Sequence, residues 1–250
     1  MPDALAAALA VPGLGWLAAA VFVAGLVRGF AGFGTAMVYL PVAGQFLSPF
    51  EALTTLVVMD MIGPLPNMPR ALRDGHPRDL LRLMAGLVLA LPLGVFVLSL
   101  VAPEVFRYGV SLAALILLAL LVGGWRWRGA LKGWMITLTG GLGGFLAGAV
   151  GLPGPPVIML YMAAPHPARV IRANITVYLL LADAVMIAVL RAFGHLVVGA
   201  LVLGAVLALP YLAGNVAGAL LFRPEAERSY RIVAYAIIAA SALSGLPLWG

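Results

Sequence analysis

Apolar residues fill long runs along the whole chain, and short loops with most of the charged residues separate these runs. Runs of about 20 apolar residues are long enough to cross a bilayer as helices. Spanning candidates lie at Phe50–Pro66, Leu83–Val101, Tyr108–Gly123, Ala173–Leu190, Leu196–Phe222 and Tyr230–Leu248. Two pairs of runs are shorter, namely Leu14–Leu26 with Thr35–Leu47 and Trp134–Ala149 with Pro155–Ala164. The pattern predicts an all-α polytopic helical membrane protein, with residues 1–250 forming a single membrane domain.

The composition agrees with this class, because 64% of the residues are hydrophobic and only 10% are charged. A soluble domain of this length would carry roughly a quarter charged residues. The formal net charge of +6 could indicate nucleic acid binding. However, the arginines cluster in short loops between apolar segments, as orientation signals do, so we expect no nucleic acid partner.

Several kinds of site are excluded by residue type. The chain has no cysteine, which excludes disulfides, thiol catalysis and cysteine metal sites. The three histidines are scattered and lack metal-ligand spacing, so we expect no metal. No Lys or Arg precedes Arg28, so the start of the chain lacks the basic region of a signal peptide and is expected to stay in the mature protein.

The two short pairs are interrupted by glycine- and proline-rich breaks, RGFAGFG at 28–34 and GLPGPP at 151–156. Proline removes a backbone donor and glycine adds conformational freedom, so neither break favours a continuous helix. In lipid, backbone that leaves the helix must be buried in protein or line a cavity. Each break is therefore a candidate tip of a re-entrant hairpin, or the kink of a single broken crossing.

Basic loops favour the hairpin. Arginines and lysine gather at 67–82, 125–133 and 223–231, and all three loops are expected to be cytoplasmic. An even number of crossings must then separate consecutive loops, which requires the second short pair to enter and leave on the same side, with Arg169 and Arg172 also cytoplasmic. The same reasoning places the N-terminus outside. A single broken crossing stays open as the alternative.

The two short pairs also resemble each other in sequence. At one common shift Gly25, Gly29 and Gly32 align with Gly144, Gly148 and Gly151, and a span with one acid in its interior (Asp60 or Asp183) follows each pair. We therefore expect two inverted repeats, about 10–124 and about 133–250, each with a broken or re-entrant hairpin and three transmembrane helices. Inverted repeats with broken helices are typical of secondary transporters.

These residues carry a family resemblance. GLVRGFAGFGTAMVYLPV, its later copy AGAVGLPGPPVIMLYM and the following RVIRANITVYLLLADAV resemble the sulfite exporter TauE/SafE family of membrane permeases over almost the whole chain. The resemblance implies a cofactor-free transporter in the cell (inner) membrane, with a small anion such as sulfite, a sulfonate or sulfoacetate as substrate. The break reads GLPGPP where many members have a plainer glycine run, which leaves the substrate open.

Substrate-binding candidates lie at and after the breaks. They are Arg28, Gly32, Phe33, Gly34 and Thr35 at the first break, Gly151, Gly154 and Pro155 at the second, and Asn174 and Tyr178 in the following span. Arg28 could attract an anion inside the membrane. It could equally snorkel to an interface or pair with an acid. For Gly25, Gly29, Gly144 and Gly148, at four-residue spacing, close helix packing is the favoured interpretation.

Asp60 and Asp183 lie inside predicted spans, where an ionised carboxylate is costly and is a functional candidate by default. Burial favours the protonated form, so both acids are candidates for proton coupling. The competing interpretation is an acid that fastens helices together.

Other functions fit less well. An enzyme is not expected, because the chain has no G-x-S-x-G motif and its aspartates lack the context of an intramembrane protease. An anion channel, or a non-transporting subunit of a larger complex, is the alternative to a secondary carrier that works by alternating access. The expected partners are a small anion and the lipid bilayer, and a homodimer is left open.

Overall fold

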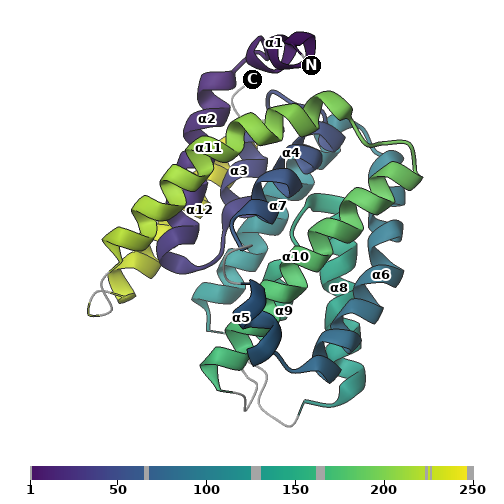
Figure 1. The fold of residues 1–250 in the computed structure, drawn as a ribbon, viewed down its shortest axis with the longest axis vertical. Helices are drawn as coiled ribbons and strands as arrows, with labels where there is room; N and C mark the ends of the chain where they lie inside the picture. Colours follow the sequence, from purple (N-terminus) through teal and green to yellow (C-terminus); the bar gives the residue numbers. More distant parts are fainter. Residues whose placement is uncertain are drawn as a thin grey trace. The chain divides into compact units, whose positions relative to one another are not determined.

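The computed structural model describes residues 2–64, 68–124, 131–161, 167–222, 225 and 227–246. Every regular element in these ranges is an α-helix, which confirms the predicted all-α class (Figure 1). The helices are α1 Pro2–Leu9, α2 Leu14–Ala31, α3 Thr35–Ala43, α4 Pro49–Ile62, α5 Met68–Asp74, α6 Pro77–Ser99, α7 Pro103–Val122, α8 Gly133–Val150, α9 Gly154–Tyr161, α10 Ala168–Ala192, α11 Val198–Leu221 and α12 Glu227–Gly245.

Six helices of the described residues are long and apolar enough to cross a membrane, so the chain is a multi-pass membrane protein. Four of them, α6, α7, α10 and α11, cover predicted spans and confirm them. The predicted span Phe50–Pro66 is shorter than expected, because α4 has 14 residues and residues 65–67 lie outside the described ranges. Helix α12 covers most of Tyr230–Leu248, but its first turns carry charged residues and it is not among the six.

The first arm of the first predicted hairpin is longer than the sequence indicated. Instead of ending at Leu26, α2 continues to Ala31, whereas α8 ends at Val150, one residue after the predicted Ala149, and each helix has 18 residues. An arginine does not end a helix, since it is a good helix former. The helices end instead where glycine takes left-handed backbone angles. The second arms, α3 and α9, have 9 and 8 residues and are too short to cross a bilayer.

The predicted basic loops are partly helical. Residues 67–82 contain α5 and the start of α6 at Pro77, and α12 begins within 223–231 at Glu227. Residues 125–130 lie outside the described ranges, with the arginines of the second loop among them. The positions at which charged residues give way to apolar ones therefore do not mark where α6 and α12 begin.

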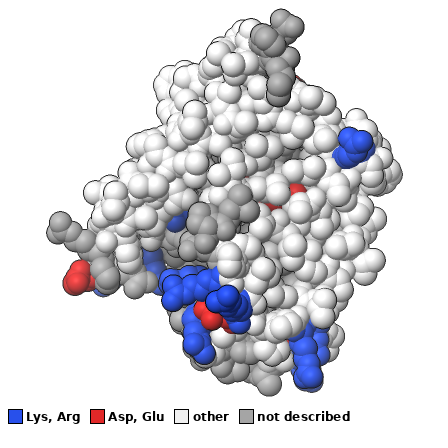
Figure 2. All heavy atoms as spheres, in the orientation of Figure 1, with Lys and Arg blue, Asp and Glu red and all other residues white. Residues whose placement is uncertain are grey.

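Large apolar side chains cover much of the surface, as expected for helices that face lipid. Helix α6 alone exposes Leu81, Val88, Leu89, Leu93, Phe96 and Val97. Figure 2 shows one face on which charged side chains gather in a few places and wide areas carry none. Exposed apolar area of this extent would be a liability in water and is suited to a bilayer.

Contacts divide the chain into two compact units. Unit 1 comprises residues 1–63, 102–118 and 195–250, and unit 2 comprises residues 64–101 and 119–194. The units do not coincide with the predicted sequence repeats. Each unit takes a broken pair of helices from one repeat (α2–α3 or α8–α9) and a long partner helix from the other (α11 or α6).

In unit 1, α2 packs along α11 through glycines. Gly25 lies against the backbone of Tyr211 and Asn215, and Gly29, one turn later, lies against Asn215 and Gly218. Because the residue numbers rise together, α2 and α11 run parallel. A Cβ atom at Gly29 would fall 2.3 Å from the Asn215 carbonyl oxygen, so only glycine permits this approach.

Unit 2 repeats this packing between α6 and α8. Three glycines of α8 lie against α6 in steps of four residues, Gly140 against Leu83, Gly144 against Leu87 and Gly148 against Leu91. These helices also run parallel, so the segment between them, which contains α7, must return to the starting end. The interpretation of Gly25, Gly29, Gly144 and Gly148 as packing glycines is confirmed.

Gly148→Ala should lower stability. The new Cβ atom would lie 2.3 Å from the Leu91 carbonyl oxygen, and overpacking of this kind costs about 1–3 kcal/mol. Gly141→Ala on the same helix is the matched control, since its nearest neighbour would lie at 3.7 Å and alanine favours a helix. Thermal unfolding of the purified protein in detergent measures both; equal midpoints for the two variants would contradict the packing assignment.

Both broken pairs return to the end at which they start. In unit 1, Gly13 before α2 lies against the ring of Phe46 after α3, while Val27 and Gly34 meet near the break. In unit 2, Gly133 at the start of α8 lies against Arg82 near the start of α6. Tyr161 at the end of α9 is tied through α10 to the turn before α6, as described below. Each pair therefore has the geometry of a hairpin.

Cysteine labelling tests whether the first hairpin is re-entrant in a bilayer. Pro12→Cys and Gln45→Cys place single thiols at exposed positions on either side of the hairpin in this cysteine-free chain. Both should react with a membrane-impermeant reagent from the same side of oriented membranes. The corresponding pair for the second hairpin, positions 134 and 165, is expected to behave alike, although residue 165 lies outside the described ranges. Labelling of positions 12 and 45 from opposite sides would show a single broken crossing.

Candidate functional site

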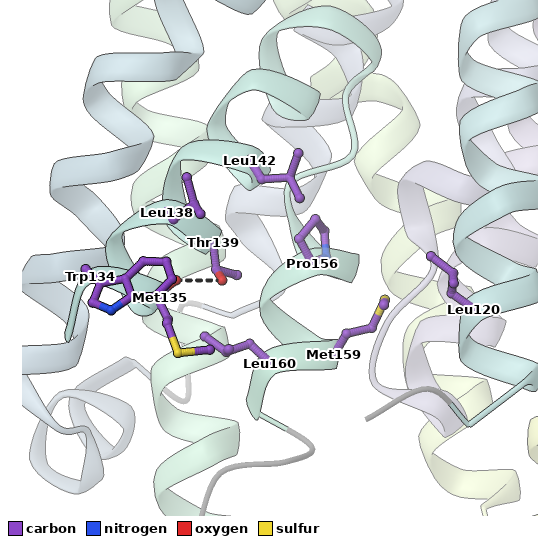
Figure 3. Close-up of a pocket in the computed structure, with 9 residues that line it drawn as sticks. All are labelled: Leu120, Trp134, Met135, Leu138, Thr139, Leu142, Pro156, Met159 and Leu160. Carbon is purple, nitrogen blue, oxygen red and sulfur yellow. Dashed lines mark hydrogen bonds between the residues drawn. The ribbon is translucent and has the colours of Figure 1, made fainter. Parts of the chain in front are cut away.

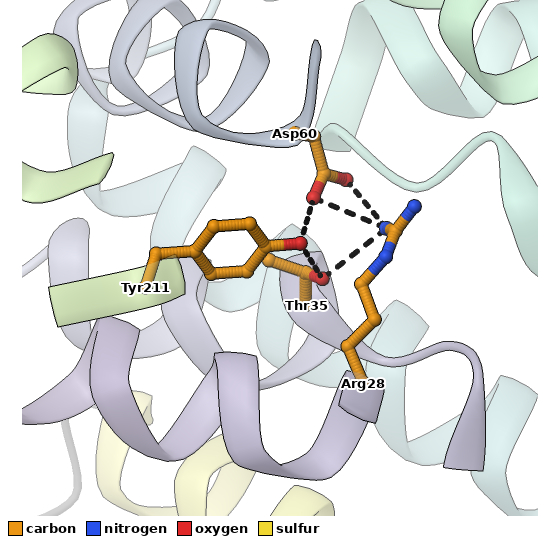
Figure 4. A network of polar contacts seen from close by, with 4 residues as sticks. All are labelled: Arg28, Thr35, Asp60 and Tyr211. Carbon is orange, nitrogen blue, oxygen red and sulfur yellow. Dashed lines mark hydrogen bonds and ion pairs between the residues drawn. The ribbon is translucent and has the colours of Figure 1, made fainter. Parts of the chain in front are cut away.

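An ion pair joins the first break to the following helix in unit 1. The Arg28 guanidinium, on α2, donates through Nη1 to both carboxylate oxygens of Asp60, on α4, at 3.1 Å each. The same nitrogen donates to the Thr35 hydroxyl at 3.3 Å. Figure 4 shows the three side chains meeting at the point where α3 begins. Of the two interpretations of Arg28, pairing with an acid is thus present in the structure.

Tyr211 of α11 completes the network. Its hydroxyl donates to Asp60 Oδ1 at 2.8 Å and lies 3.3 Å from the Thr35 hydroxyl (Figure 4). Tyr211 and Thr35 are buried, with 0% and 2% of their surface exposed. The Arg28 and Asp60 side chains are 14% and 15% exposed. The hydroxyls are therefore inside the protein, whereas the ion pair can be reached from outside it.

Local structure explains why these residues meet. Gly32 ends α2 with φ 80°, and its N–H donates to the Arg28 carbonyl at 2.7 Å. Gly34 precedes α3 with φ 102°, so the chain reverses within three residues and Thr35 becomes the first residue of α3. Both glycines have backbone angles that other residues rarely adopt. They shape the break and set Arg28 beside Thr35.

The N-terminus of helix α4 is capped, which fixes where the helix begins and therefore the position of Asp60 along it. The Ser48 backbone N–H donates to the Glu51 carboxylate at 2.9 Å, and Ser48 and Glu51 form a capping box. Pro49 occupies the first turn, where its missing donor costs nothing. Phe33, the remaining candidate at this break, packs against Tyr235 of α12.

The second break, in unit 2, has a different chemistry. Gly151 ends α8 with φ 72°, and its N–H donates to the Ala147 carbonyl at 2.9 Å. Gly154 and Pro155 are the first residues of α9 and both are buried. Proline has no N–H, and Pro156 follows directly, so the first turn of α9 offers fewer donors than that of α3. The sequence of this break, GLPGPP, contains no basic residue, whereas RGFAGFG begins with Arg28.

Asn174 ties three segments of unit 2 together. Its side-chain amide donates to the Tyr161 hydroxyl, at the end of α9, at 2.9 Å. Its carbonyl oxygen accepts from the His76 backbone N–H, in the turn before α6, at 2.7 Å. Asn174 is fully buried. These contacts hold the starts of α6 and α10 and the end of α9 at one end of the unit.

Tyr178, one turn further along α10, is also fully buried. Its hydroxyl lies close to Gly143 of α8, where a Cβ atom would fall 2.4 Å from the oxygen and 2.8 Å from the Pro153 carbonyl oxygen. Among the described residues this hydroxyl has no hydrogen-bond partner. Tyr178 is therefore the polar side chain that α10 brings to the second break.

Asp183 lies in the middle of α10 and is 9% exposed. It belongs to unit 2, whereas Asp60 belongs to the network of unit 1. The two acids that the sequence paired as proton-coupling candidates therefore stand in different surroundings.

A cavity of about 470 Å³ opens on unit 2 away from these polar groups (Figure 3). Its walls are almost wholly apolar, and they come from Leu120, Trp134, Met135, Leu138, Thr139, Leu142, Pro156, Met159 and Leu160. The Thr139 hydroxyl is satisfied within α8, since it donates to the Met135 carbonyl at 2.8 Å. A lining without charge does not suit a small anion.

Comparison with known families decides the class. The model of the family described as sulfite exporter TauE/SafE matches residues 17–245, nearly the whole chain. The chain belongs to the TauE/SafE family. It is therefore a member of a family of membrane permeases, which confirms the resemblance and the expectation that it is not an enzyme. No curated protein and no solved structure gives a significant match.

In this TauE/SafE protein the structure brings together Arg28, Thr35 and Asp60 from the predicted set, with Gly32 and Gly34 shaping the turn between them. Sequence reasoning missed Tyr211. The available signal was a tyrosine after Pro210 in the middle of a largely apolar span, since a polar group at that depth needs a partner.

Proposed function

We propose that this TauE/SafE protein is a secondary transporter that exports a small anion, and that the charge of the anion is held at the break between α2 and α3. Sulfite, sulfonates such as sulfoacetate and related organic anions are the proposed substrate class. The observation that carries the proposal is a partly exposed arginine inside a membrane domain, beside the start of a short helix.

The chemistry at this break suits an oxyanion. The first turn of α3 has no side-chain cap, and a helix N-terminus carries unpaired N–H groups and partial positive charge. Arg28 adds a full positive charge, which interacts more strongly in low dielectric than in water. The Thr35 and Tyr211 hydroxyls add groups that can donate to the oxygens of a sulfonate or carboxylate.

Transport is proposed to proceed by alternating access, with the two hairpins as its moving parts and proton coupling at Asp60 or Asp183. The substrate-binding roles of Gly151, Gly154, Pro155, Asn174 and Tyr178 at the second break belong to this proposal. The basic segments are proposed to lie in the cytoplasm and the protein in the cell membrane. In support, α6, α8 and α10 all start at one end of unit 2, where Arg82 and Asn174 lie.

Flux measurements in proteoliposomes test the proposal. Labelled sulfite, methanesulfonate, sulfoacetate and acetate are supplied one at a time, with and without a pH gradient, and protein-free liposomes serve as the control. Saturable flux that is driven by a gradient supports the carrier. Flux that rises linearly with concentration would indicate a channel. If none of these anions is bound or moved, the proposed function is wrong.

A further inference from the structure

We infer that the apolar cavity lined by α8 and α9 binds an acyl chain of an anionic phospholipid, whose phosphate lies against Lys132 and Arg82 at the start of α8. This inference goes beyond the proposed function and holds whatever anion the protein carries. It gives the second hairpin, whose break contains no basic residue, a ligand taken from the bilayer.

The cavity runs from the first turn of α8 to the second break. Figure 3 shows Trp134, Met135 and Leu160 at one end of it, and Leu142 and Pro156 at the other. Residues 134 and 142 are eight positions apart, which corresponds to about 12 Å along a helix. Pro156 belongs to the first turn of α9, so the far end of the cavity touches the break itself. A groove of this length, with a volume of about 470 Å³, suits a stretch of hydrocarbon chain.

The lining is apolar and open to the outside of the protein. Leu138 and Leu142 are exposed, although they lie in the middle of a helix that is long enough to cross the membrane. The Thr139 hydroxyl is satisfied within α8 and asks for no polar ligand. Because lipid tails are as apolar as leucine, such a lining alone would not hold one lipid in preference to another. Selectivity must come from polar groups at the end of the cavity.

Basic side chains stand at the end where Trp134 lies. Lys132 directly precedes α8 and is exposed. Arg82 of α6 lies beside the next residue, since a Cβ atom at Gly133 would fall 2.7 Å from Arg82 Cζ. The Arg82 side chain is 47% exposed, and its ion pair with Asp79 is long, at 3.7 Å from Nη1. The guanidinium therefore has nitrogens that can bond the oxygens of a phosphate.

This charge favours a lipid over a second copy of the chain as the occupant. Two copies that met at the cavity around a two-fold axis along the membrane normal would bring the same ends of α8 together. The like charges of Lys132 and Arg82 would then repel one another across the interface, and Arg78, on the same face of α6 one turn before Arg82, would add to the repulsion. An anionic headgroup instead neutralises them. The ring of Trp134 is of the kind that sits at the level of headgroups.

Lipid binding to the purified full-length protein in detergent tests the headgroup site. The probes are phosphatidylglycerol and phosphatidylcholine with identical acyl chains, and native mass spectrometry measures the affinity of the first lipid bound. Phosphatidylglycerol should bind at least about fivefold more tightly, the effect of one basic side chain near a membrane surface. Lys132→Gln should lower its affinity about fivefold and leave phosphatidylcholine unchanged. Arg191→Gln is the matched control, because this exposed arginine lies in the last turn of α10, away from the starts of α6 and α8, and it should bind both lipids as the wild type does.

A second variant tests the place of the chain. Thr139→Trp fills the cavity and should weaken the binding of both lipids. Leu89→Trp is its control, since Leu89 is an exposed residue of α6 outside the lining, and it should bind both lipids normally. A phosphatidylglycerol with a photoreactive acyl chain reports the place in the wild-type protein, where cross-links should fall on the lining residues of α8 and α9. This measurement decides the matter should Thr139→Trp fail to fold.

Four results would overturn the inference. They are equal affinity of the wild type for the two lipids, a preference that survives in Lys132→Gln/Arg82→Gln, cross-links that fall outside the cavity, and a disulfide between two copies of Thr139→Cys in membranes, which would show a second copy as the occupant. None of these measurements uses anion flux, so the inference can fail while the proposed function stands, and the reverse.

Discussion

Replacement of Arg28 by alanine is expected to abolish saturable anion flux in proteoliposomes. Arg28 is the basic side chain of the only polar network that the described residues place at the first break. Charge-assisted hydrogen bonds contribute about 1.5–3 kcal/mol each, so their loss should weaken anion binding at least about tenfold to a hundredfold. The alanine variant also leaves Asp60 free to repel the substrate, which adds to the loss.

Two further variants show whether the effect comes from the anion site. Arg28→Lys keeps the charge but lacks the planar guanidinium, so we expect weakened flux with a raised KM. Arg191→Ala removes an exposed arginine from the last turn of α10 and should leave flux unchanged. Folding is checked by thermal unfolding in detergent. An Arg28→Ala protein that folds and retains wild-type KM would remove Arg28 from the substrate site.

The parts of this site that the sequence could reveal are those that break a local rule. A lone arginine within an apolar run, glycines where a helix should continue and an acid in a span each stand out without knowledge of the fold. Arg28, Gly32, Gly34 and Asp60 were found in this way. The ion pair between Arg28 and Asp60 could not be predicted from the sequence. The two residues are 32 positions apart, and their pairing depends on how α2, α3 and α4 pack.

Long-range packing explains what was missed. The Tyr211 hydroxyl is bonded to Asp60, which is 151 residues away in the sequence. The residues around Tyr211 do not indicate which helix will pack against it. The end of α2 was placed too early for a related reason, since the closeness of α11 makes continued helix favourable up to the glycine turn. Helix type and approximate position follow from local periodicity, whereas helix ends and polar partners follow from neighbours.

Asn174 illustrates the limit in the other direction. A buried asparagine at the start of a span is a candidate for binding substrate, and that role stays a prediction. In the structure its amide and carbonyl groups are bonded to Tyr161 and to the His76 backbone, which fasten α9 and the turn before α6 to α10. A buried polar residue signals that a partner exists, and the sequence does not say whether that partner is a ligand or the protein itself.

The Arg28–Asp60 pair should also be measurable as a coupled contribution to stability. Asp60→Leu leaves a guanidinium partly buried without its carboxylate, and breaking such a pair is expected to cost about 3 kcal/mol. Arg28→Met should cost less, because a carboxyl group can become neutral by taking up a proton and an arginine cannot.

The double variant Arg28→Met/Asp60→Leu should recover most of the loss, since replacing an ion pair that is largely removed from water by apolar side chains is often neutral. A double-mutant cycle of thermal unfolding in detergent should therefore give a coupling of about 2 kcal/mol, and additive single effects would show that the two residues do not interact. Flux separates the two roles of the pair. A double variant as stable as the wild type but without anion flux would show that the protein can fold without these charges, and that their retention in the membrane serves transport.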